Sequence, residues 1–169
     1  LLLTTISFAQ TEREKGIEFY ENGDYKAAVE VLKKSVETDE TDGEAWRFLA
    51  MSFARIGNEE QALKAFDKAA EFRDEDLNKK YDLPVKFIEL PKNNYTKEAR
   101  RNNVTGRVKL AVEFGKDGQI KHIFILRELP DGLTEKAVEA ARKIKFKPAV
   151  KNGEPVTVIK FVEYSFLIF

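Results

Sequence analysis

The chain has 169 residues, with 29 basic and 29 acidic side chains, a formal net charge of zero, no cysteine and one histidine. This length suits one or two domains, and the 43% of apolar residues excludes a disordered chain. The lack of cysteine excludes a disulfide framework, a thiolate nucleophile and a thiolate metal cage, and one histidine excludes a multi-histidine metal site.

The charges are divided unevenly along the chain. Residues 1–80 carry 18 acidic and 12 basic side chains, whereas residues 81–169 carry 11 acidic and 17 basic ones. This asymmetry favours two modules with different functions. The alternative is that two domain types simply differ in surface composition. Neither half is basic enough to predict binding of nucleic acid.

Residues 1–10 are apolar and uncharged, and charged residues follow abruptly after Thr11. This pattern is typical of the end of a secretory signal peptide, with Ser7 and Ala9 at the small-residue positions of a cleavage site. The alternative is a buried N-terminal strand or helical turn. A longer, uncleaved version would anchor the protein in a membrane, for which about 20 apolar residues are needed.

The first half repeats itself at an offset of 34 residues: Phe19 recurs as Phe53, Gly23 as Gly57, and Ala28 as Ala62. A glycine after one helix and Asp24 or Asn58 before the next predict helix–turn–helix units. The predicted helices cover residues 11–21, 24–37, 43–56 and 59–72.

The second unit, with Trp46, Phe53, Ala62 and Phe66 at the expected spacing, resembles the tetratricopeptide repeat, and the first unit has Glu12 where the tryptophan would be. We assign residues 11–74 to two such repeats and residues 75–81 to a capping helix or linker. Two repeats are too few to bury a continuous core, so their exposed ends need to be covered. The alternatives to a capping helix are the second domain and self-association.

The resemblance implies that the repeats bind a protein or peptide on their concave face. Three arginines on this face, together with a tyrosine and a methionine, favour an acidic or amphipathic ligand. A solvated helix face is the alternative. The resemblance places six residues on this face: Arg13, Ile17, Tyr20, Arg47, Met51 and Arg55.

Beyond a boundary near residue 82, apolar residues alternate with polar ones from Val108 to Phe114, which predicts a strand with one buried face. A second strand is expected over residues 119–126, then a helix with an apolar stripe from Leu133 to Ile144, and a third strand over residues 156–166. The predicted fold class is a two-domain chain: all-α helical hairpins, then a small α+β domain with a three-stranded antiparallel sheet and a packed helix. A short helix is expected over residues 95–101.

Residues 82–169 resemble the C-terminal domain of the TonB family from Tyr95 to Phe166. The match is carried by Tyr95, Ala99-Arg100, Gly106-Arg107-Val108, Asp117-Gly118, Leu126, Leu133, Ala137, Phe146-Lys147-Pro148-Ala149, Gly153, Pro155-Val156 and Phe166. The chain departs from the family at Thr96, where proline is usual, and it has five scattered prolines and no proline-rich spacer.

The resemblance implies that the domain captures an extended segment of an outer-membrane TonB-dependent receptor at the edge of its last strand. Both registers of this strand are substantially apolar, which indicates contact with a partner, with a second copy in a homodimer or with the repeat domain. The alternative is burial within the chain. The candidate edge residues are Tyr95, Val158, Lys160, Val162, Tyr164 and Phe166.

We find no catalytic arrangement, cofactor site or metal site, since the sole histidine, His122, lies in a predicted strand without a serine nearby in the sequence. The lack of a catalytic arrangement predicts that the protein is not an enzyme, and the two resemblances imply a protein-binding scaffold of TonB-type envelope transport. Its expected location is the periplasm or cell envelope of a Gram-negative bacterium, with an inner-membrane anchor if the signal is uncleaved. The alternative is a periplasmic assembly adaptor without a role in energy coupling.

Overall fold

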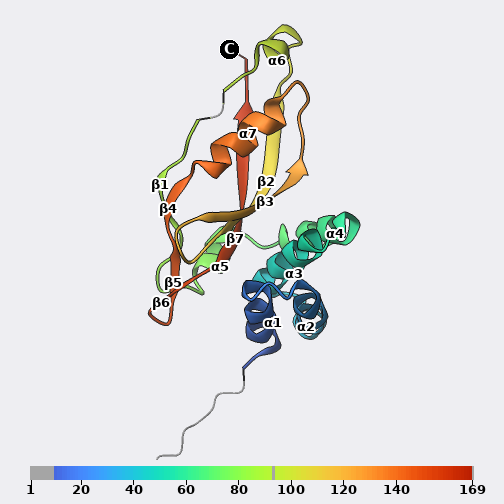
Figure 1. Ribbon diagram of the computed structural model, residues 1–169, viewed down its shortest axis with the longest axis vertical. Coiled ribbons are helices and arrows are strands. Elements are labelled where there is room, and N and C mark those ends of the chain that lie inside the picture. Colours follow the sequence, from blue (N-terminus) through green and yellow to red (C-terminus); the bar gives the residue numbers. More distant parts are fainter. Residues whose placement is uncertain (1–9, 93, 169) are drawn as a thin grey trace, which may run out of the picture. The chain divides into compact units, whose positions relative to one another are not determined.

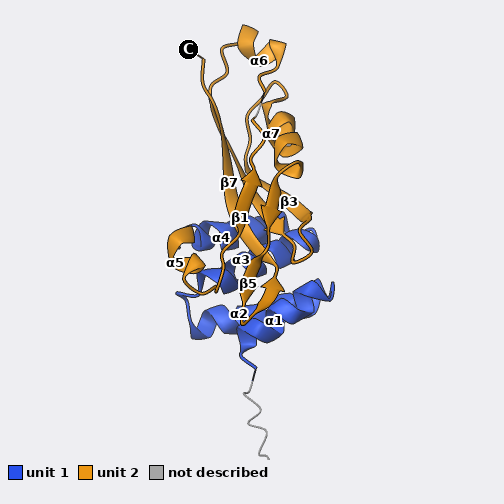
Figure 2. Cartoon of the chain, turned by 90° about the vertical axis from the view of Figure 1, so that its left-hand side faces the viewer, with its two compact units in different colours: residues 1–71 blue, residues 72–169 orange. Residues whose placement is uncertain are grey.

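The computed structural model describes residues 10–92 and 94–168. The chain divides into two compact units, residues 1–71 and 72–169 (Figure 2). The predicted signal segment falls, except for Gln10, outside the described residues. None of the described helices is both long enough and apolar enough to cross a bilayer.

The first unit consists of two helical hairpins (Figure 1). Side-chain oxygens of Thr11, Asp24, Asp42 and Asn58 accept hydrogen bonds from backbone N–H groups in the first turns, so each helix begins at a local sequence signal. The predicted all-α fold of this half is confirmed, with helices α1 (Glu12–Glu21), α2 (Tyr25–Thr38), α3 (Gly43–Arg55) and α4 (Glu59–Ala69).

The hairpin of α1 and α2 depends on a close approach at Gly16. A Cβ atom on this residue would lie 2.5 Å from Cγ of Leu32, which is fully buried. Glycine is therefore required here because α2 occupies the space that a larger side chain would need.

The second unit contains a three-stranded antiparallel sheet in the order β3-β2-β7, with α7 (Leu133–Arg142) across one face (Figure 1). The strands are β2 (Gly106–Phe114), β3 (Ile120–Arg127) and β7 (Val158–Phe166). Alternate residues of β2 and the apolar stripe of α7 meet in one core, so the predicted α+β fold is confirmed.

Several short elements differ from the sequence prediction. The third strand begins at Val158 rather than at residue 156, because the preceding residues form a separate hairpin around Asn152-Gly153. The short helix predicted over residues 95–101 begins at Lys97, since Thr96 is its N-cap. The remaining elements are α5 (Asp74–Asn78), β1 (Lys86–Glu89), which pairs with β4 (Lys145–Lys147), α6 (Lys97–Arg101), and the hairpin of β5 (Ala149–Lys151) and β6 (Glu154–Val156).

Candidate functional site

Strand β7 lies at one edge of the three-stranded sheet. It pairs with β2 in an unbroken antiparallel register from Val158 to Phe166, and no described strand pairs with its other side. The strand at the opposite edge, β3, pairs with β2 through two register shifts. Because such bulges twist a strand away from regular pairing, β7 offers the more regular edge to an incoming strand.

The side chains of β7 alternate between the two faces of the sheet. Val158, Tyr164 and Phe166 are buried in the core of the unit, and Val162 packs against that core partly buried. These four predicted edge residues therefore fix the position of the strand. On the other face, the ring of the partly exposed Phe161 lies 4.7 Å from Nζ of Lys109, and the carboxylate of the exposed Glu163 lies 3.5 Å from the guanidinium of Arg107. The outward backbone N–H and C=O groups of β7 lie along the edge of the sheet.

The hydroxyl of Tyr164 is buried and has no hydrogen-bond partner among the described residues. Burial raises the pKa of Tyr164 to about 12, because the phenolate would lose its hydration. This side chain is a structural part of the strand and is not presented to a ligand.

Tyr95 supports the end of β7 from the side. Its hydroxyl donates a hydrogen bond to the carbonyl oxygen of Val104 at 2.8 Å, and its ring meets the ring of Phe166 edge-on at 5.4 Å. The guanidinium of Arg100 lies 5.3 Å from the centre of the Tyr95 ring. Tyr95, which the sequence analysis predicted as an edge residue, therefore packs against Phe166, the last residue of β7.

Lys160 has a different position from the one expected of an exposed edge residue. Its side chain is only 7% exposed, and its ammonium lies 3.3 Å from Oδ2 of Asp74 and donates a hydrogen bond to Oδ1 of Asn78 at 2.9 Å. Both partners belong to α5, which lies beside the first half of β7 (Figures 1 and 2). The part of the strand beyond this contact begins at Phe161.

The α5 contact was missed by sequence reasoning. The acidic run from Asp74 to Asp76 is visible in the sequence, but it lies more than 80 residues from Lys160, and nothing local connects the two. Only the tertiary fold brings them together.

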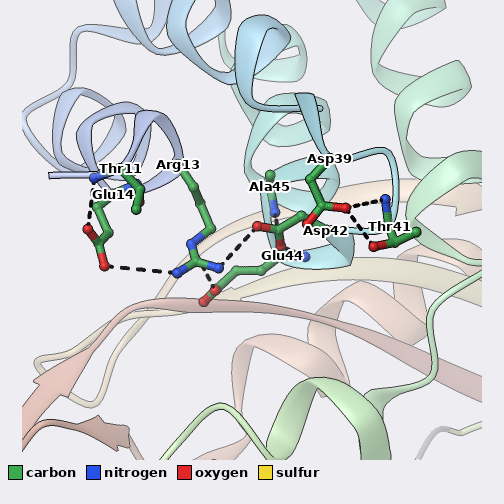
Figure 3. Close-up of polar contacts among 8 residues, drawn as sticks. All are labelled: Thr11, Arg13, Glu14, Asp39, Thr41, Asp42, Glu44 and Ala45. Atoms are coloured by element: carbon green, nitrogen blue, oxygen red, sulfur yellow. Dashed lines mark hydrogen bonds and ion pairs between the residues drawn. The ribbon is translucent and has the colours of Figure 1, made fainter. Parts of the chain in front are cut away.

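In the first unit, the predicted groove residue Arg13 is held by carboxylates of its own chain (Figure 3). Its guanidinium lies 3.0 Å from Asp42, 3.7 Å from Glu44 and 3.9 Å from Glu14. Burial opposes its ionisation, yet the charges of Asp42 and Glu44 outweigh burial and raise the pKa of Arg13 above its ordinary value. The arginine therefore joins the start of α1 to the start of α3.

The other predicted groove residues are buried, half-buried or in contact with side chains of the same unit. Tyr20 is buried and meets the rings of Tyr25 and Phe48 edge-on. Arg55 donates a hydrogen bond to the hydroxyl of Tyr25 and lies 4.5 Å from its ring centre. Met51 and Arg47 are buried and Ile17 is half-buried. The described structure thus does not present three free arginines to an acidic ligand, and partner binding at this face stays a prediction.

Comparison with known families agrees with this architecture. Residues 91–168 match the family described as Gram-negative bacterial TonB protein C-terminal, and residues 19–78 match the tetratricopeptide repeat family. The chain is therefore similar to the tetratricopeptide repeat family over residues 19–78 and to the TonB C-terminal family over residues 91–168. Both families are protein-interaction modules, and TonB proteins are associated with the envelope of Gram-negative bacteria.

Two NMR structures are among the solved structures that resemble the chain. The solution NMR structure of the Pseudomonas aeruginosa TonB CTD is 26% identical and covers 52% of this chain and 89% of that chain, with a TM-score of 0.43. The NMR structure of the Helicobacter pylori TonB-CTD is 26% identical and covers 46% of this chain and 72% of that chain, with a TM-score of 0.34. No curated protein matches the chain.

Proposed function

We propose that the second unit binds an extended segment of an envelope protein by adding it as a strand to the open edge of β7. The observation that carries the proposal is the unbroken register of β7 with β2, which leaves the outward backbone groups of β7 regularly spaced. Backbone hydrogen bonds then supply affinity, and side chains at alternate positions supply selectivity.

The proposed partner is the extended plug-region segment of an outer-membrane TonB-dependent receptor, and the proposed site of action is the periplasm. The support is the match of residues 91–168 to the TonB C-terminal family. In this proposal the tetratricopeptide repeats act as a scaffold, and the protein has no catalytic activity of its own.

The contact of Lys160 with α5 limits the length of the proposed interface. Since Asp74 and Asn78 hold the side chain of Lys160, the incoming segment pairs with the residues from Phe161 to Phe166. Six residues of strand accommodate a short peptide segment, as is usual in strand addition.

The test is binding of receptor plug peptides to the full chain, measured by fluorescence anisotropy with a labelled peptide. Each peptide is also made with N-methyl groups on alternate residues, in both of the two alternating sets. Because the N–H groups of adjacent strand residues point to opposite sides, one methylated set should abolish binding and the other should leave it unchanged. Equal binding by both methylated peptides would contradict strand addition.

Proline substitutions test the protein side of the same contact. Of Val162→Pro and Glu163→Pro, one removes an N–H group that faces β2 and the other removes one that faces the open edge. The variant that retains the native circular dichroism spectrum should lose peptide binding. If that variant binds as the native chain does, or if no plug peptide binds, the assembly adaptor becomes the better interpretation.

A further inference from the structure

Exposed apolar side chains gather on the short antiparallel ladder of β1 and β4 in the second unit (Figure 1). Within the described part of the chain, four of the eight exposed large apolar side chains lie in residues 83–90, which we call the apolar segment. They are Leu83 (61% exposed), Phe87 (38%), Ile88 (62%) and Leu90 (56%). Single exposed apolar residues are common, but such a group indicates an interaction surface.

The backbone of the apolar segment is held in place although its side chains are exposed. Leu83 exchanges two backbone hydrogen bonds with Val150, at 3.2 and 2.7 Å, and β1 pairs with β4. The ring of Phe87 meets the ring of the buried Phe114 edge-on at 5.5 Å. The exposed side chains therefore project from an ordered support, so their burial against a partner would cost little backbone entropy.

Positive charge accompanies the apolar segment. Lys86 of β1 lies directly opposite Lys147 of β4, and such like-charged cross-strand pairs are unfavourable. The one carboxylate of the two strands, that of Glu89, pairs with Lys145 at 2.7 Å. With the flanking residues counted, residues 82–90 and 136–147 carry six basic and three acidic side chains. The surface therefore has an excess of positive charge that an anionic partner would offset.

These properties suit an anionic bilayer better than a protein strand or a second copy. The register of β1 shifts between Phe87 and Glu89, and such a bulge interrupts the regular backbone spacing that strand addition requires. A second copy docked through the same surface would bring net positive charge against net positive charge. At a bilayer, apolar side chains enter the interface while lysines keep their ammonium groups at the lipid phosphates.

We propose that the apolar segment and the lysines of the β1–β4 ladder bind the surface of a bilayer rich in anionic phospholipid. Leu83, Ile88 and Leu90 enter the interface, and Lys86 and Lys147 lie at the phosphates. The contact is peripheral, because a few side chains bury far less apolar surface than a membrane-spanning helix does. It does not depend on the proposed strand addition, since none of these residues belongs to β7.

The test is sedimentation of the full chain with sucrose-loaded vesicles of phosphatidylcholine alone, or of phosphatidylcholine and phosphatidylglycerol in equal parts. The chain should bind the anionic vesicles roughly tenfold or more tightly than the neutral ones, because each lysine at an anionic surface contributes a factor of about five. Raising the salt from about 0.1 M to about 1 M should weaken this binding severalfold, because salt screens the charges.

Matched variants locate the contact. Ile88→Ser should weaken binding to the anionic vesicles roughly tenfold, whereas Leu167→Ser, at a similarly exposed residue outside the apolar segment, should leave binding unchanged. Lys147→Gln should weaken binding about fivefold, whereas Lys34→Gln, at an exposed lysine of α2, should change it less than about twofold. All four positions are exposed, so the variants should retain the native circular dichroism spectrum.

A fluorescent label reports the contact directly. The chain has no cysteine, so Ile88→Cys and Lys34→Cys each provide a single site for a nitrobenzoxadiazole label, whose emission depends on its exposure to water. With anionic vesicles, the label at residue 88 should shift its emission to the blue, because it enters the interface. The label at residue 34 should keep its emission, because it stays in water.

Four results would overturn the proposal: no binding to either vesicle, equal binding to both, equal effects of Ile88→Ser and Leu167→Ser, or equal shifts of the two labels. Analytical ultracentrifugation without lipid tests the competing occupant, a second copy of the chain. A dimer that Ile88→Ser dissociates, together with no binding to vesicles, would assign the apolar segment to self-association.

Discussion

The buried lysine on β7 allows a sharp test of how α5 is held. Lys160 is 7% exposed and Asp74 is 37% exposed at their side chains, and Nζ of Lys160 also donates to Asn78. Removing one partner of a fully buried ion pair costs about 3–5 kcal/mol, whereas an exposed pair contributes about 0–1 kcal/mol. Because Asp74 is partly exposed and Asn78 remains, we expect Asp74→Ala to cost about 1–2 kcal/mol.

Removal of the lysine should change the stability less than removal of the aspartate does. Lys160→Met keeps an apolar chain of similar length and removes the charge that must be solvated, so stability should stay within about 1 kcal/mol of the native value. In the double variant, Asp74→Ala should then lose most of its effect, giving a coupling energy of about 1–2 kcal/mol.

The assay is urea unfolding of the full chain followed by far-ultraviolet circular dichroism, with hydrogen exchange over residues 158–166 as a local measure. Asp76→Ala is the matched control, since Asp76 lies on the same helix, is exposed, and pairs with Lys79 and Arg73. It should leave the protection of β7 unchanged. Equal effects of Asp74→Ala and Asp76→Ala, or a larger loss from Lys160→Met than from Asp74→Ala, would refute the reasoning.

Three further predictions concern single side chains. Gly16→Ala places a Cβ atom 2.5 Å from Leu32 Cγ, so despite the better helix propensity of alanine we expect a net loss of about 1 kcal/mol in thermal unfolding, and an unchanged midpoint would contradict the close approach. Arg13→Met leaves the carboxylate of the largely buried Asp42 without its guanidinium and should cost about 2 kcal/mol in urea unfolding, whereas a loss below about 0.5 kcal/mol would show that the ion pair contributes nothing. The folded pKa of Tyr164 is raised above its unfolded value to about 12, so its contribution to stability is fully present below about pH 10 and is lost as the pH rises towards 12. Tyr164→Phe should flatten this alkaline decline, and an identical decline in both proteins would assign it to other groups.

The sequence by itself determined the elements whose signals are local. The helices of the first unit begin at capping residues such as Asp24 and Asn58, and the 34-residue repeat predicted their pairing, because a cap and an apolar stripe act within a few residues of one another. The same holds for β2, whose alternation of apolar and polar residues predicted its buried face.

Only the tertiary structure decided the roles of the charged residues that the sequence predicted at binding surfaces. Arg13 and Lys160 were expected on binding surfaces, yet Arg13 meets Asp42 and Glu44, and Lys160 meets Asp74 and Asn78. A charged side chain in a sequence looks the same whether it faces water or a distant carboxylate. Its partner is fixed by packing between segments far apart in the chain, which no local pattern encodes.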